Sequence, residues 1–151
     1  MTWRHPFDKR TITSRFGATA NRVSPHRGLD YAPKEQTPIP AVSKGTVRLV
    51  QWSDVLGWVL MQTAWDQING KAIFVGYCHL FEKPTLKVGA KLKMGQVIGK
   101  VGNTGSASRG AHLHLTIGPA QKSVFAGVVF DPEEIIDQQM SYCDKCKRYD
   151  A

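Results

Sequence analysis

Cysteine is scarce in this sequence, and no long hydrophobic run occurs. The 151 residues include three cysteines, whereas a small secreted domain framed by disulfides carries a larger and even number. Residues 1–10 lack the apolar core of about 7–15 residues that a secretory signal requires. No apolar stretch approaches the roughly 20 residues of a membrane-spanning helix. We therefore expect a protein that assembles in a reducing cytoplasm and does not insert into a membrane.

Long helices have little room, because 14 glycines and 8 prolines interrupt the chain. Segments with β-branched, aromatic or alternating residues lie between these breaks, at 45–52, 57–63, 71–79, 96–101 and 112–117. One helix is predicted over residues 132–140, where Asp131 is the N-cap and Pro132 takes the first helical position. The length suits one domain. We predict a mainly β (β-rich α+β) domain over residues 1–140, with a twisted antiparallel sheet and a short C-terminal helix, and a tail or truncated linker over residues 141–151.

The chain is strongly basic, with a formal charge of +8 and a pI near 9.6. This charge predicts attraction to polyanions such as nucleic acid, an anionic membrane or an acidic wall polymer. Nucleic acid is disfavoured, because no recognition helix, zinc-finger spacing or aromatic RNA-binding stripe is present. Residues 40–47 and 91–102 are weakly similar turn-and-strand units, as in biotinyl and lipoyl carrier domains, which makes Lys93 a candidate carrier lysine.

Four of the five histidines stand where they can take part in chemistry. His26 and Asp30 are four residues apart in a segment that proline and glycine keep extended, so their side chains share one face. His112 and His114 also share a face, since they are two apart in a predicted strand. His79 ends another apolar strand. His5, next to Pro6 near the start of the chain, is interpreted as an ordinary structural histidine.

This set of side chains matches a catalytic zinc site. Such a site uses three protein ligands and keeps a fourth position for water, whose pKa the metal lowers to about 7. Two histidines and one aspartate supply the three ligands, and two further histidines remain for proton transfer and oxyanion stabilisation. Spacing alone does not decide which histidines hold the metal.

The motifs and their order resemble the lysostaphin and LytM type of zinc endopeptidase, which cuts peptide cross-links of bacterial peptidoglycan. The resemblance covers about residues 12–117. It rests on Ser14-Arg15-Phe16-Gly17, His26-Arg27-Gly28-Leu29-Asp30, Gly45-Thr46-Val47, Tyr77-Cys78-His79-Leu80, Gly95-Gln96-Val97-Ile98-Gly99, Gly102-Asn103-Thr104-Gly105 and His112-Leu113-His114.

The resemblance implies a role for each of the five residues. His26, Asp30 and His114 would hold one Zn²⁺, and His79 and His112 would flank the metal-bound water as proton carriers and transition-state stabilisers. The sheet would form the floor of a narrow groove walled by loops. The expected partner is peptidoglycan, through its stem peptide or cross-bridge, with the enzyme acting as a monomer.

The start of the chain favours a phage endolysin that stays in the host cytoplasm until lysis and then acts on the wall. The alternatives are a catalytically weak or inactive wall-binding or activator module, and a domain of a secreted bacterial autolysin. Cys143 and Cys146 form a Cys-x-x-Cys pair that is open to three interpretations: half of a structural zinc site, a redox pair, or exposed thiols in a linker.

Overall fold

The computed structural model describes residues 2–143 and 148–149. None of the helices in these ranges is long and apolar enough to cross a bilayer. The mainly β fold predicted above is confirmed. In chain order the elements are η1 (Lys9–Thr11), β1 (Ile12–Ser14), β2 (Leu29–Tyr31), β3 (Pro38–Pro40), β4 (Gly45–Ser53), β5 (Gly57–Asp66), β6 (Lys71–Leu80), β7 (Lys91–Leu92), β8 (Val97–Lys100), β9 (Leu113–Gly118), η2 (Gln121–Val124), α1 (Pro132–Ser141), β10 (Tyr142–Cys143) and β11 (Arg148–Tyr149).

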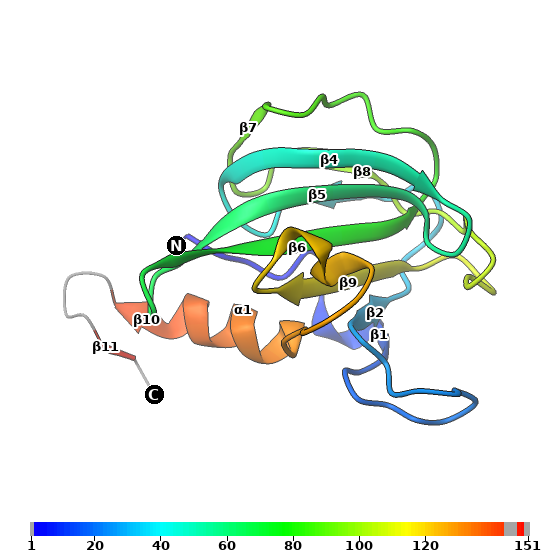
Figure 1. The fold of residues 1–151 in the computed structure, drawn as a ribbon, viewed down its shortest axis with the longest axis horizontal. Coiled ribbons are helices and arrows are strands. Elements are labelled where there is room, and N and C mark those ends of the chain that lie inside the picture. The colour runs from blue at the N-terminus through cyan, green and yellow to red at the C-terminus, as the bar shows by residue number, and fades with distance from the viewer. Residues whose placement is uncertain (1, 144–147, 150–151) are drawn as a thin grey trace.

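Seven strands form one antiparallel sheet in the order β1-β2-β9-β6-β5-β4-β7 (Figure 1). The long strands β4, β5 and β6 are consecutive in sequence and pair as hairpins. Strand β9 returns from a distant part of the chain and inserts between β6 and β2. This insertion brings β2, β6 and β9, which carry or adjoin the candidate histidines and aspartate, side by side.

The sheet buries side chains on both of its faces. Alternation along β5 places Leu60 in the larger apolar cluster and its neighbours Val59 and Met61 in a smaller one, because successive side chains of a strand point to opposite faces. The larger cluster also contains Trp3 and Ile136, so the N-terminal segment and α1 cover that face.

The predicted strand over residues 96–101 exists as β8, but its expected place in the main sheet is wrong. Strand β8 pairs with β3 in a separate two-stranded sheet. Residue composition predicts an extended segment but carries no information on its partner, which depends on contacts between distant parts of the chain. The short strands β1, β2, β3 and β7 were not predicted, since two or three residues are too few to show alternation.

Helix α1 begins as predicted. The Asp131 carboxylate accepts hydrogen bonds from the backbone N–H groups of Glu133 and Glu134, and Pro132 occupies the first turn. The helix ends one residue beyond the predicted end, at Ser141. The middle of the helix is bonded to the N-terminal segment, because a ring nitrogen of His5 lies 2.7 Å from Asp137 Oδ1.

The segment predicted as a tail, residues 141–151, is structured in part. Ser141 closes α1, and β10 pairs with β11 as an antiparallel two-residue ladder. Cys146 lies outside the described residues, and Cys143 is described only through its backbone in β10. The domain boundary at residue 140 and the role of these two cysteines therefore stay predictions.

A polar cluster is buried inside the sheet at Tyr77. The Tyr77 hydroxyl donates a hydrogen bond to Gln62 Oε1 at 2.5 Å and accepts one from the backbone N–H of Val42 at 3.0 Å. The Gln62 amide donates in turn to the Ser43 carbonyl oxygen at 3.1 Å. These bonds fasten the chain that enters β4 to the centre of the sheet.

Tyr77→Phe is expected to lower the free energy of unfolding by about 1–3 kcal/mol, because two buried polar groups lose their partner. Equilibrium denaturation in urea measures the change. The matched control is Tyr142→Phe at the half-buried first residue of β10, which should change stability by less than about 0.5 kcal/mol. Equal stability of Tyr77→Phe and the unmodified protein would show that the hydroxyl network contributes nothing.

Candidate metal centre and active site

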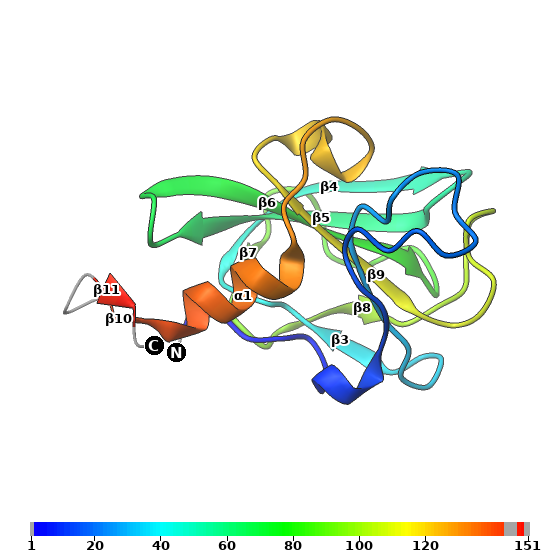
Figure 2. The same ribbon diagram turned by 90° about the horizontal axis from the view of Figure 1, so that it is seen from below.

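Loops gather at one end of the main sheet and enclose a groove. In both ribbon views residues 15–28, the β4–β5 turn and the loop before β9 lie together at the right-hand end (Figures 1 and 2). The groove has a volume of about 1000 Å³, and its lining includes His26, Asp30, His79, His112 and His114. All five residues predicted to form the site therefore share one cavity.

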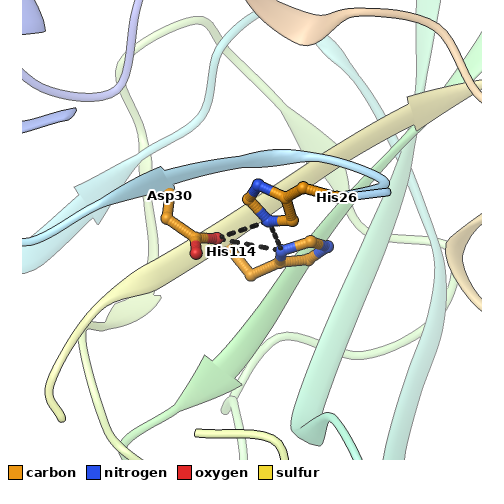
Figure 3. A group of neighbouring side chains, drawn as sticks. All are labelled: His26, Asp30 and His114. Carbon is orange, nitrogen blue, oxygen red and sulfur yellow. Dashed lines mark hydrogen bonds and ion pairs between the residues drawn. The ribbon is translucent and has the colours of Figure 1, made fainter. Parts of the chain in front are cut away.

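Three of these residues point one ligand atom each toward a common centre (Figure 3). His26 Nε2 lies 3.1 Å from Asp30 Oδ1 and 3.1 Å from His114 Nδ1. The third edge, from His114 Nδ1 to Asp30 Oδ1, is 3.0 Å. The three atoms form a nearly equilateral triangle.

Strand pairing places two of the three ligand atoms. Asp30 in β2 and His114 in β9 are directly opposite each other in the antiparallel ladder, where facing side chains are close neighbours. His26 comes from the loop that leads into β2, and its Nδ1 lies 3.1 Å from the Arg15 carbonyl oxygen and 3.0 Å from Ser14 Oγ. A proton on Nδ1 donated to that carbonyl leaves the Nε2 lone pair free to face the centre.

The triangle fits a metal ion. With metal–ligand bonds of about 2.0–2.2 Å, two ligand atoms of a tetrahedral zinc site lie about 3.3–3.6 Å apart. The observed edges of 3.0–3.1 Å are within a few tenths of an ångström of that spacing. Two imidazole nitrogens and one carboxylate oxygen are also a ligand set that catalytic zinc accepts, with one position left for water. His26, Asp30 and His114 could therefore hold the ion.

The charge states of the ligands suit metal binding. Burial opposes ionisation of Asp30, but its contacts with His114 and His26 outweigh this effect and hold the pKa of the carboxyl well below its usual range. Burial lowers the pKa of His114, and the hydrogen bond to Asp30 opposes the shift only in part. At neutral pH the site thus offers a carboxylate and an uncharged imidazole, which are the forms that bind a metal.

His79 and His112 lie beside the three ligand residues. The ring centroids of His79 and His112 are 4.7 Å apart, and that of His79 is 6.1 Å from that of His114. His112 Nε2 is 3.9 Å from Asp30 Oδ2. The two imidazoles therefore lie beside the three ligand atoms and line the same groove.

The backbone of His79 is held in an uncommon conformation. Its φ is +62° at the end of β6, in the left-handed region that a non-glycine residue occupies at a cost of about 1–3 kcal/mol. The His79 N–H donates to the Leu56 carbonyl oxygen at 2.7 Å. Burial lowers the pKa of His79 to about 4, so its ring is uncharged at neutral pH and can accept a proton.

Thr104 positions His79, and sequence reasoning did not assign this role. A ring nitrogen of His79, Nδ1, donates to the Thr104 carbonyl oxygen at 2.6 Å, which leaves Nε2 free. The Thr104 hydroxyl donates to the Leu80 carbonyl oxygen at 2.7 Å and accepts from the Trp58 N–H at 3.2 Å. A Cβ on Gly57 would overlap Thr104, so this glycine permits the approach. In the sequence, the Asn103-Thr104-Gly105 motif was the one feature that marked this segment as part of the resemblance.

His112 is oriented by its own loop. Its Nδ1 lies 2.9 Å from the Gly110 carbonyl oxygen and 3.2 Å from Ser108 Oγ. The predicted strand over residues 112–117 begins one residue later, at Leu113, and His112 forms only an isolated bridge to Gly102. His112 and His114 nevertheless both face the groove, as the alternation of the strand predicted.

His5 lies apart from the groove and contacts a different part of the fold. One ring nitrogen, Nδ1, is 3.0 Å from the Tyr31 hydroxyl, and the other bonds to Asp137. The structural interpretation of His5 agrees with these contacts. Lys93, the alternative carrier lysine, lies in the turn after β7 and outside the groove.

Gly28 separates the two ligands His26 and Asp30 for a steric reason. A Cβ at this position would overlap the Leu115 carbonyl oxygen and lie 2.7 Å from Cε1 of His114.

Gly28→Ala is expected to weaken zinc binding by about 10–100-fold, because the ligand ring must move. Competition with a chromophoric chelator measures the affinity. Gly99→Ala is the matched control, since its Cβ would sit 3.6 Å from Leu80, in ordinary contact; an unchanged affinity in Gly28→Ala would contradict the steric role.

Known proteins resemble this chain in sequence. The model of Peptidase family M23 matches residues 24–126. ShyC, a peptidoglycan DD-endopeptidase of Vibrio cholerae, is 30% identical over 124 residues, which cover 74% of this chain and 25% of that protein. The chain thus spans about a quarter of the length of the curated relatives it matches.

Solved structures resemble it in fold. The catalytic domain of EnpA, a prophage-encoded M23 protein of Enterococcus faecalis, was solved as a mutant and is 30% identical, with a TM-score of 0.68 over 84% of this chain and 92% of that chain. A zinc-containing peptidase of Vibrio cholerae is also 30% identical, with a TM-score of 0.65 over 78% of this chain and 36% of that chain.

Proposed function

The chain belongs to peptidase family M23, and from this premise we propose that it is a zinc-dependent endopeptidase that hydrolyses peptide cross-links of bacterial peptidoglycan. The family predicted from the motifs is confirmed. The observation that carries the proposal is the convergence of His26, Asp30 and His114 on one centre with two further histidines beside it. An inert binding module would not require the second pair.

His26, Asp30 and His114 would hold the Zn²⁺ ion, which when bound would supply a water ionisable near pH 7 and would polarise the scissile carbonyl. The protein's own contribution comes from the two flanking histidines. His79, uncharged and with Nε2 free, can accept a proton, because its Nδ1 is occupied by the Thr104 carbonyl oxygen. His112 is held through its Nδ1 by the Gly110 carbonyl oxygen and presents Nε2 to the groove. Once Nε2 has taken up a proton, its N–H can stabilise a developing oxyanion or protonate the leaving amine.

Peptidoglycan as substrate is supported by the relatives and by charge. ShyC is named for its action on peptidoglycan. The formal charge of +8 would also favour adsorption to an anionic wall polymer. We place the scissile bond in a peptide cross-link, because ShyC is named as an endopeptidase of peptidoglycan and the site could activate water against a peptide carbonyl.

Metal analysis combined with wall digestion tests the proposal. The purified protein is expected to contain about one zinc per chain and to release new amino termini from peptidoglycan. Chelation should stop the release and added zinc should restore it. Zinc binding without cleavage of any wall type would overturn the enzymatic proposal in favour of a binding or activator module. A protein that does not take up zinc would contradict the assignment of the three ligands.

We further propose that the enzyme is a phage endolysin that acts as a monomer and is released from the host cytoplasm at lysis. The similarity to a prophage-encoded protein over 92% of the latter's solved chain supports this, as does a site built within one chain. Expressed in a bacterial cytoplasm, it should lyse cells only after the inner membrane is permeabilised. Lysis without permeabilisation would contradict this part, and a dimer in light scattering would contradict the monomer.

A further inference from the structure

The groove that holds the candidate site is positively charged. Three arginines line it, Arg22, Arg27 and Arg109, and Asp30 is its one acidic residue among the described part of the chain. Asp30 is also a metal ligand in the proposed function. The remaining charge of the groove is therefore entirely positive, which favours a substrate with an anionic group.

Two of the three arginines have partners within the protein. Arg27 donates to the carbonyl oxygens of Gly127 at 2.8 Å and Ser123 at 3.0 Å, so it fastens the loop around η2. Arg22 donates to Ser14 Oγ at 3.2 Å, and its Nη2 lies 3.6 Å from Asp30 Oδ2. These contacts occupy both guanidinium groups.

Arg109 differs from them, because its exposed side chain forms no hydrogen bond or ion pair with any residue that the structure describes. The backbone that carries it is fixed on both sides by Asn103. The Asn103 carbonyl oxygen Oδ1 accepts a hydrogen bond from Ser108 Oγ at 2.5 Å and another from the Gly110 N–H at 2.9 Å. The same loop positions His112 through the Gly110 carbonyl oxygen. A firmly held loop thus presents an unengaged guanidinium to the groove, three residues before a candidate catalytic histidine.

A guanidinium pairs best with a carboxylate, which it can bind through two parallel hydrogen bonds. We propose that Arg109 is a specificity-determining residue that binds a free carboxylate next to the scissile peptide bond. This inference rests on the proposed function and narrows its substrate class to cross-links whose residues carry a free carboxylate, as in directly linked diamino-acid stem peptides. Uncharged cross-bridges, such as chains of glycine, would be poor substrates.

The test uses two purified cross-linked stem-peptide dimers that differ only in one group beside the scissile bond, a free carboxylate in one and its carboxamide in the other. With the zinc-loaded protein, kcat/KM is expected to be about tenfold or more higher for the carboxylate dimer, mainly through KM. In Arg109→Gln this preference should fall to near one, and Arg109→Lys should recover part of it. Arg48→Gln is the matched control, because Arg48 is exposed on β4 and outside the groove; it should keep the full preference.

The possible outcomes distinguish the role of Arg109 from the proposed endopeptidase activity. Equal cleavage of the two dimers by the unmodified protein, or an unchanged preference in Arg109→Gln, would overturn the role of Arg109 and leave the endopeptidase intact. Efficient cleavage of a glycine bridge in preference to both dimers would overturn it as well. Failure to cleave any of the three substrates would overturn both proposals.

Discussion

Replacing His112 by alanine is expected to lower kcat for peptidoglycan cleavage by about 10²–10⁴-fold, the usual contribution of a positioned proton donor or acceptor. Zinc content should remain at one ion per chain, because the three ligand atoms come from His26, Asp30 and His114. The kinetics of amino-terminus release and the metal content of the same preparation measure both effects. This combination is the signature of a residue that acts on the substrate and not on the metal.

His5→Ala is the matched control for His112→Ala. It removes a histidine that bonds to Tyr31 and Asp137 outside the groove, so it should reduce stability without reducing kcat of the folded protein. Loss of zinc in His112→Ala would make His112 a ligand, and full activity in that variant would remove it from the catalytic machinery.

Asp30→Ala should abolish both metal binding and activity. Asp30 Oδ1 contacts both ligand histidines at 3.0–3.1 Å, and its loss leaves two neutral nitrogens without the charge that attracts the cation. Changes beyond the ligands themselves already cost about 10–100-fold in metal affinity, so a larger loss is expected here. Zinc titration and wall digestion measure it, and the activity should match that of the chelated unmodified protein.

Asp54→Ala provides the comparison for Asp30→Ala. Asp54 accepts a hydrogen bond from Trp52 Nε1 at an exposed position beside the groove, so its removal should leave zinc affinity unchanged. A variant lacking Asp30 that still binds zinc tightly would refute the three-ligand assignment.

The five residues singled out in the sequence all line one groove of the structure, whereas the arrangement of the strands was predicted less completely. Residues that can bind a metal or move a proton are few in this chain, and their types restrict the reactions that a site can support. Five of them, in two short motifs and at the end of one strand, were enough to indicate a candidate site. The partner of β8 was not predictable, because pairing depends on long-range contacts that local composition does not encode. Likewise, the strand alternation placed His112 and His114 on one face, but only the fold shows that His114 lies directly opposite Asp30 in the ladder.

Supporting residues were harder to recognise than the site itself. Thr104 contacts His79 through its backbone carbonyl oxygen, which any residue type carries. The Asn103-Thr104-Gly105 motif therefore marked the segment but did not indicate the contact with His79. Gly28 is explained by the closeness of β9, which only the folded structure reveals. Arg109 could not be distinguished in the sequence from the other basic residues. The structure showed that it lines the groove and, among the described residues, has no hydrogen-bond or ion-pair partner.

The pairing of β2 with β9 would make the stability of the folded protein depend on metal binding. Asp30 and His114 are 84 positions apart, and His26 and His114 are 88 apart, so an ion bound between them closes most of the chain into a loop. Because the native fold brings these residues together, an ion that binds the native state alone adds stability as free metal rises above its dissociation constant. The ion would then act as a reversible cross-link between the segment of residues 26–30 and His114. Where free zinc is scarce, the protein would be both inactive and more easily unfolded, so its lifetime would follow the metal supply.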